Sequence, residues 1–294
     1  MSVKSDLQTS VSEFQIPNSN LAVPHLRIRP SRGWSALKLR EVWEYRELLY
    51  FLVWRDVKVR YKQTALGVLW VVLQPLATTI VFTLIFGNLA KMPSENLPYA
   101  VFALAGLLPW NYFSGAIGRG GSSLVGSANL ISKVYFPRLI IPISSVLAGL
   151  VDFGITFLLL VALMLFYGYP PTLSWLLLPF FLLMAIATAL GVSLWLSALN
   201  VQYRDVGYLI PFLIQLWFFA TPVVYPSSLI PAPWSLLYAL NPMAGVVDGF
   251  RWALFGNTAA PGPLILVSIA VVIVTLVSGL FVFKRMERTF ADVV

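Results

Sequence analysis

The sequence predicts an all-α polytopic membrane protein with six transmembrane helices, an N-terminal amphipathic helix and a re-entrant helical hairpin before the last span. Of its 294 residues, 59% are hydrophobic and 11% are charged, whereas soluble domains are about 25% charged. Apolar segments long enough to cross a bilayer recur between short polar loops. One further stretch, residues 226–263, is too apolar for an ordinary loop and too interrupted for a span.

Three regions are expected along the chain. Residues 1–33 are polar, contain three prolines and show no apolar period, which predicts a disordered cytosolic tail. Residues 34–62 form the amphipathic helix, and residues 63–294 form the six-span domain. On the amphipathic helix a charged face opposes an apolar face, so we expect it to lie along the membrane surface. The charged face carries Arg40, Glu44, Glu47, Arg55, Lys58 and Lys62, and the apolar face carries Val42, Tyr45, Leu49, Leu52, Val53 and Val59.

The six expected spans are residues 66–89, 99–125, 139–166, 175–199, 208–224 and 264–283. The first would be roughly 36 Å long as a helix, which is enough to cross a hydrocarbon core. The second span becomes rich in Gly and Ser in its second half and contains Arg119, so that half is expected to face protein or a water-filled cavity. Alternatively, Arg119 marks the cytosolic end of the helix. In the fourth span, small residues repeat every four positions and predict a close-packing face, at Ala185, Ala189, Ser193 and Ser197.

The stretch between the fifth and sixth spans contains two short helical patterns, residues 235–240 and 244–256, separated by Asn241 and Pro242. A re-entrant hairpin fits this pattern, because irregular backbone at membrane depth needs a covering of protein or water. Asp248 and Arg251 are three residues apart on the second pattern, and we expect them to form an intrahelical ion pair.

The basic residues set the orientation. Most Lys and Arg residues fall on one side of the predicted spans, so both termini are expected in the cytosol. The net charge of +8 is explained by this topology and by anionic lipid head groups, and nucleic acid is not an expected partner.

The residues of the common enzyme mechanisms are missing. The chain has no Cys and a single His, His25 in the tail, and Asp152 is the only carboxylate well inside a span. No paired acids, HExxH motif or Ser–His pair is present, so we expect no catalytic residue and no metal site. No phosphate-binding loop of the G-x-x-x-x-G-K-[ST] type occurs either. If ATP drives this protein, a separate chain binds it; a carrier that needs no ATPase stays an open alternative.

Five blocks match one family in order and spacing: residues 55–76 (RDVKVRYKQTALGVLWVVLQPL), 102–117 (FALAGLLPWNYFSGAI), 128–142 (ANLISKVYFPRLIIP), 200–206 (NVQYRDV) and 238–256 (YALNPMAGVVDGFRWALFG). Over residues 39–294 the chain resembles the membrane subunit of type-2 ABC exporters, in particular bacterial exporters of O-antigen, capsule or teichoic acid.

The resemblance implies a permease that moves a lipid-linked polysaccharide across the bacterial inner membrane, through a channel between two copies of the chain. It implies a homodimer with two nucleotide-binding subunits, which hold ATP and magnesium, and no cofactor on this chain. Residues 40–61 would be the interface helix, 128–136 a coupling helix, and 229–240 with 243–255 the paired hairpin helices. The alternative within the family is an exporter of small drugs or lipids.

The resemblance also implies two sets of site residues. Aromatic rings can support a sliding sugar polymer, although the alternative for each ring is an interfacial aromatic belt; the candidates are Trp110, Tyr112, Trp217, Phe218, Phe219 and Tyr225. Arg119 would meet a pyrophosphate or other anionic head group of the lipid carrier. The candidates for contact with the ATPase are Arg55, Lys58, Leu130, Lys133, Tyr135, Phe136, Arg204 and Asp205.

Overall fold

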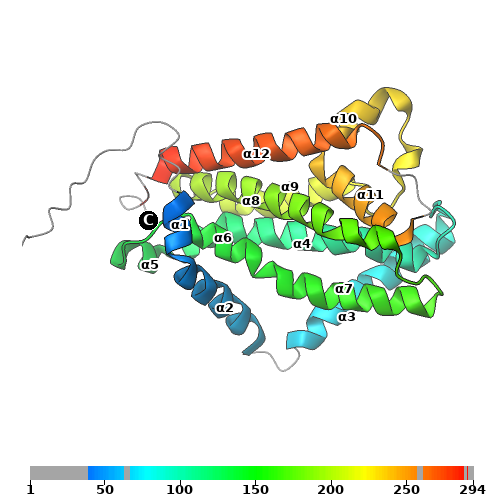
Figure 1. Cartoon of the computed structure of the whole chain (residues 1–294), viewed down its shortest axis with the longest axis horizontal. Coiled ribbons are helices and arrows are strands. Elements are labelled where there is room, and N and C mark those ends of the chain that lie inside the picture. Colours follow the sequence, from blue (N-terminus) through cyan, green and yellow to red (C-terminus); the bar gives the residue numbers. More distant parts are fainter. Residues whose placement is uncertain (1–38, 63–66, 257–260, 288–289, 291–294) are drawn as a thin grey trace, which may run out of the picture. The chain divides into compact units, whose positions relative to one another are not determined.

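The computed structural model describes residues 39–62, 67–256, 261–287 and 290, and within these ranges the regular structure is helical (Figure 1). The predicted tail, residues 1–33, lies outside the described residues. Residues Leu37–Val294 make one compact unit.

Five of the described helical segments are long and apolar enough to cross a membrane: Leu69–Leu89, Tyr99–Gly126, Ile140–Phe166, Leu173–Gln202 and Ile265–Met286. The first is built from α3 (Gly67–Phe82) and a π-helical turn (Thr83–Leu89). The second is α4 (Tyr99–Gly126), the third joins α6 (Ile140–Leu147) to α7 (Gly149–Phe166), the fourth contains α8 (Leu178–Gln202), and the last is α12 (Ile265–Met286).

The fifth expected span is shorter than predicted. Helix α9 (Val206–Phe219) has 14 residues, roughly 21 Å, which is less than the thickness of a hydrocarbon core. It ends five residues before the expected boundary, where Pro222 has no N–H to donate and the Thr221 hydroxyl donates to the Trp217 carbonyl at 2.8 Å. A count of six spans therefore stays a prediction.

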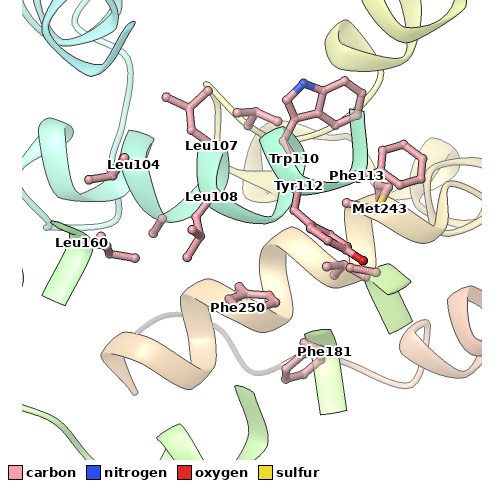
Figure 2. Close-up of a cluster of buried hydrophobic side chains, with 14 of the residues drawn as sticks. Leu104, Leu107, Leu108, Trp110, Tyr112, Phe113, Leu160, Phe181, Met243 and Phe250 are labelled. Carbon is pink, nitrogen blue, oxygen red and sulfur yellow. The ribbon is translucent and has the colours of Figure 1, made fainter. Parts of the chain in front are cut away.

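Helix α4 is the central element of the bundle. Across its membrane-spanning window 78% of the residues are buried, against 11% for the α3 segment, because α4 packs on α3, α6, α7, α8, α9 and α11. Figure 2 shows its side chains Leu108 and Tyr112 near Phe250 of α11 and Phe181 of α8. A helix this enclosed must be apolar on every side, which its sequence is over the first half.

The predicted close-packing face of α8 is confirmed. Ala185, Ala189, Ser193 and Ser197 are each completely buried, and the Ser193 hydroxyl donates to the Ala116 carbonyl of α4 at 3.4 Å. The opposite face of α8 meets α12 backbone to backbone at Gly191 and Gly279, where an added Cβ on Gly191 would lie 2.8 Å from Thr275 and Leu276.

The amphipathic segment forms α1 (Leu39–Glu44) and α2 (Arg46–Lys62), and α2 packs against α6. Its faces separate less cleanly than expected. Leu52 is buried in a second hydrophobic cluster, but Val59 of the predicted apolar face is 64% exposed. Large aromatic side chains are also exposed on these two helices, at Trp43, Tyr50, Phe51 and Trp54. The other members of the second cluster include Leu124, Ile131, Phe136, Leu139, Ile140 and Phe283.

The hairpin consists of α10 (Ser235–Ala239) and α11 (Pro242–Phe255). The first helix is much shorter than the predicted 229–240, because Pro226, Pro231 and Pro233 interrupt the chain and only two short 3-10 turns form before α10. The second helix starts and ends as the sequence indicates. Asn241 caps its N-terminus, and Gly256 follows it with a φ of +66°, a left-handed conformation that glycine adopts readily.

Candidate functional site

A polar cavity of about 240 Å³ lies between α3, α4 and α7. Apolar residues such as Val71 and Phe153 form part of its wall, and the remainder is polar. Polar and ionisable groups gathered between apolar helices make this cavity the candidate functional site. The polar lining side chains are Gln74, Asn111, Tyr112, Ser114, Arg119, Asp152 and Thr156.

Arg119 reaches this cavity from α4, seven residues before the helix ends at Gly126, or roughly 10 Å along the axis. Its guanidinium fits against Gly115 and Gly149, since an added Cβ at Gly115 would lie 2.9 Å from Nη1 and one at Gly149 would overlap Nη2. Its Nε is buried and has no hydrogen-bond partner among the described residues. This position favours the cavity interpretation of Arg119 over that of a helix-end marker.

Asp152 of α7 is bound from the amphipathic segment. Its Oδ2 pairs with the Arg60 guanidinium, and its Oδ1 accepts a hydrogen bond from the Tyr61 hydroxyl. Both donors lie at the end of α2, about 90 residues away in sequence. Burial, together with the hydrogen bond to the carboxylate, raises the pKa of the Tyr61 phenol. The contact therefore fastens the end of α2 to the middle of a predicted span.

Two of the proposed channel aromatics are core residues. Trp110 and Tyr112 are each 4% exposed, and Figure 2 shows both among the buried side chains of α4. Trp110 packs edge-on against Phe218 with a centroid distance of 5.5 Å, and the Tyr112 hydroxyl donates to the Val146 carbonyl at 3.3 Å. Both rings therefore expose little surface, and Tyr112 meets open space chiefly at the polar cavity, so their role in a channel stays a prediction.

The remaining aromatics cluster where α9 meets the hairpin. Trp217 and Phe218 are half-buried, whereas Phe219 is 64% exposed. The Trp217 ring packs edge-on against Phe113 at 4.9 Å. Tyr225 donates its hydroxyl hydrogen to the Phe219 carbonyl at 3.0 Å. Of this group, Phe219 has the most surface available for a ligand, a second copy of the chain or lipid.

Asn241 joins the end of α9 to the start of α11. Its side-chain oxygen accepts hydrogen bonds from the Trp217 indole at 2.8 Å and from the Met243 backbone at 3.0 Å. Its amide nitrogen donates to the Ala220 carbonyl at 2.9 Å and to the Thr221 hydroxyl at 3.0 Å. All of its usual hydrogen-bonding capacity is used. Sequence reasoning treated Asn241 only as a break, although Asn followed by Pro is a recognised helix start.

Arg251 does not form the expected ion pair with Asp248. Its guanidinium donates to the backbone carbonyls of Pro222 at 2.6 Å, Val223 at 2.6 Å and Phe102 at 3.4 Å. It also lies 3.7 Å above the Phe102 ring, and the residue is 2% exposed. The carbonyls of the unwound segment after α9 need donors that the helix no longer supplies, and Arg251 provides them.

The proposed ATPase contacts divide into exposed and buried groups. Tyr135 is 87% exposed directly after α5 (Ala128–Lys133), but Phe136 is 5% exposed and belongs to the second cluster. Phe136 therefore holds the segment on the bundle and cannot itself meet another chain in this conformation. Arg55 is half-buried and bonded to Asp56, and Leu130 is partly buried. The exposed candidates are Lys58, Lys133, Arg204 and Asp205.

No three His, Cys, Asp or Glu side chains come together as a metal site within the described ranges.

Sequence reasoning singled out Arg119 and Asp152 but missed Arg60, Tyr61 and Gly149. Arg60 and Tyr61 had no local signal, because their partner is distant in the chain. Residues 63–66, between α2 and α3, lie outside the described residues.

The model of the ABC-2 type transporter family matches residues 47–255. A Myxococcus xanthus protein named O-antigen export system permease protein RfbA is 36% identical over 86% of this chain and 98% of its own length. A Klebsiella pneumoniae protein of the same name is 32% identical over 84% of this chain and 95% of its own. The polysialic acid transport protein KpsM of Escherichia coli is 23% identical over 80% of this chain and 91% of its own length. The family match and these nearly full-length similarities show that the chain belongs to the ABC-2 type transporter family.

Proposed function

We propose that this chain is the permease subunit of an ATP-driven exporter that moves a lipid-linked polysaccharide across the bacterial inner membrane. The observation that carries the proposal is the near full-length similarity to permeases named for O-antigen export. A composition of 59% hydrophobic residues and five helices of spanning length agree with a membrane location.

The energy source is expected on a partner. The sequence lacks a phosphate-binding loop, so two nucleotide-binding subunits would supply ATP and magnesium to two copies of this chain. The surfaces that such subunits would contact are the exposed residues beside α2 and α5, chiefly Lys58, Lys133 and Tyr135. Figure 1 shows α2 and α5 near the same end of the helical bundle, which is the predicted cytosolic end.

The contact at Asp152 offers a route from the partner to the membrane. A displacement of α2 is transmitted to α7 through Arg60 and Tyr61, since a packed bundle responds as connected rigid elements. The exit is assigned to the hairpin, which Asn241 and Arg251 hold against the end of α9. Opening for a polymer would then separate the two copies' hairpins rather than melt either one.

The proposal is tested by deleting the gene in its native host and following lipid-linked glycan. We expect the deletion strain to accumulate the glycan on its lipid carrier inside the cell and to lose it from the surface. Plasmid-borne wild-type chain should restore export, and purification in mild detergent should bring a nucleotide-binding subunit with it.

Two results would contradict the proposal. Unchanged surface glycan in the deletion strain, with a different exported molecule missing, would reassign the substrate. A preparation that transports without any nucleotide-binding subunit would overturn the ATP-driven mechanism.

A further inference from the structure

We propose that the polar cavity between α3, α4 and α7 binds the phosphate group of an amphipathic lipid, with Arg119 as its anion-binding side chain. The site itself rests on the geometry of this cavity. The identity of the lipid as the carrier of the exported glycan rests on the proposed function.

The first step is the state of Arg119. The two oxygens of Asp152 already accept from Arg60 and Tyr61, and Arg119 forms no ion pair or side-chain hydrogen bond among the described residues. An arginine inside a membrane bundle is costly unless an opposite charge or several acceptors surround it. Asp152 thus lies near two guanidinium groups, those of Arg60 and Arg119, so positive charge is in excess beside the cavity.

The second step is the space in front of this cation. Gly115 and Gly149 leave room for the guanidinium, and a side chain at either position would displace it. The side-chain amides of Gln74 and Asn111 line the same cavity, and the hydrogen bonds found at these two residues use their backbone carbonyls. A guanidinium and two amides offer several N–H donors in one place, an arrangement that suits the oxygens of a phosphate group.

The third step is the kind of molecule that reaches this depth. The cavity measures about 240 Å³, smaller than the sites that enclose whole small-molecule ligands, so it accommodates a head group and not a polymer. Its α3 wall belongs to a helix whose outer surface is apolar and exposed, including Trp70, Leu73 and Ile80. A phosphate ester with a long hydrocarbon tail can bind the polar cavity with its phosphate and contact the apolar surface of α3 with its tail. Free phosphate can bind only the cavity.

Affinity measurements on the full chain in neutral detergent test the proposal, with native mass spectrometry as the readout. The probes are undecaprenyl phosphate and undecaprenol, which differ only in the phosphate, together with phosphatidylglycerol and free phosphate. We expect undecaprenyl phosphate to bind and undecaprenol to bind at least about 10-fold more weakly, the effect of losing one charge-assisted contact.

Three variants locate the binding. Arg119→Gln should weaken the binding of undecaprenyl phosphate by about 10-fold and leave the binding of undecaprenol unchanged. Arg119→Lys should weaken undecaprenyl phosphate binding less, because lysine retains the positive charge although it lacks the planar guanidinium that donates two parallel hydrogen bonds. Arg40→Gln removes the same charge from an exposed position of α1 and should change nothing. In the absence of lipid, Arg119→Gln should melt no lower than the wild type, because it removes a costly charge that makes no direct ion pair among the described residues.

Equal binding in Arg119→Gln and the wild type would overturn the proposal, and so would a large drop in melting temperature, since Arg119 would then be a structural residue. Arg119-dependent binding of phosphatidylglycerol as tight as that of undecaprenyl phosphate would assign the site to membrane phospholipid. Arg119-dependent binding of free phosphate alone would overturn the lipid assignment. Each of these results is independent of whether the deletion strain loses surface glycan, so the site and the proposed function fail separately.

Discussion

Arg60 at the end of α2 and Asp152 in α7 form an ion pair, although 92 residues separate them in the sequence. The Tyr61 hydroxyl donates to the other oxygen of the same carboxylate. All three side chains are half-buried, so solvent screens the contact less than it screens a surface salt bridge. This contact connects the helix that faces the predicted cytosolic partner with a helix of the predicted span.

Breaking this contact should loosen α2 without unfolding the bundle. Asp152→Asn removes the charge but keeps a similar shape, and we expect the amide hydrogens of α2 to exchange faster in hydrogen–deuterium exchange of the full chain. In the complex with its ATPase, export should fall more than ATP hydrolysis. The exchange of charges in Arg60→Asp with Asp152→Arg should recover part of the loss. Exchange rates identical to the wild type in Asp152→Asn would show that α2 is held by other contacts.

The Asn241 side chain should be a major determinant of hairpin stability. Asn241→Ala removes four hydrogen bonds, one of which caps the N-terminus of α11, and we expect a loss of about 2–4 kcal/mol in the free energy of unfolding. Asn241→Asp retains the acceptor for Trp217 and Met243 but loses both donors, so its effect should be smaller. Denaturant titration in detergent measures both.

Trp217→Phe is the matched control for this group, because it removes only one of the four hydrogen bonds. Its cost should be about 1 kcal/mol. If Asn241→Ala costs no more than Trp217→Phe, the other three hydrogen bonds contribute nothing measurable.

Replacing Arg251 should destabilise the protein unless the new side chain donates hydrogen bonds to the same three carbonyls. In Arg251→Met, the carbonyls of Phe102, Pro222 and Val223 lose their donor, and we expect a loss of about 3–5 kcal/mol. Arg251→Lys retains the charge but cannot reach three carbonyls at once, so the stability of this variant should lie between that of Arg251→Met and that of the wild type. Asp248→Asn should cost less than Arg251→Met, since Arg251 is held by backbone carbonyls. Equal costs for the two would restore the ion-pair interpretation. Thermal unfolding monitored by tryptophan fluorescence compares the set.

The sequence predicted the long helices well because their determinants are local. Apolar length and the spacing of Ala185, Ala189, Ser193 and Ser197 are visible within α8 itself. The predicted helix boundaries were wrong where groups distant in sequence determine the backbone conformation. The end of α9 is bound by Asn241, which donates to the Ala220 carbonyl, and α10 begins only after Pro231 and Pro233.

Site residues were harder to predict than helices for a related reason. Trp and Tyr suit a channel wall, an interfacial belt and a protein core alike, so composition alone did not place Trp110 and Tyr112 in the core. The partners of Arg251 lie in an unwound segment 28 or 29 residues away and, for Phe102, 149 residues away. Such contacts follow from packing, which one sequence does not show.

The contact between α8 and α12 should require glycine. At Gly279 an added Cβ would overlap the Gly191 carbonyl, and the obstacle is backbone that cannot rotate away. We expect Gly279→Ala to lower the melting temperature and to cost about 1–3 kcal/mol, as overpacking does. Gly154→Ala in α7 is the control, because nothing lies within 4 Å of its added Cβ, and it should be neutral or slightly stabilising. Similar effects of both substitutions would indicate that the α8–α12 contact relaxes freely.

Tyr135 and Phe136 are neighbours in sequence with opposite environments, and their replacements should have opposite effects. Phe136→Ala opens a cavity in the second cluster and should cost about 3–5 kcal/mol of stability. Tyr135→Ala removes an exposed ring and should leave stability unchanged, but we expect it to reduce the ATPase stimulation and export of the complex. Tyr167→Ala is a control at the end of α7, where the ring is 43% exposed, and it should affect neither. If Tyr135→Ala retains full export and full stimulation, the exposed end of α5 is not where the ATPase is coupled. Melting temperatures, measured alongside ATPase and export rates, separate this result from simple misfolding, since only Phe136→Ala should unfold at a lower temperature.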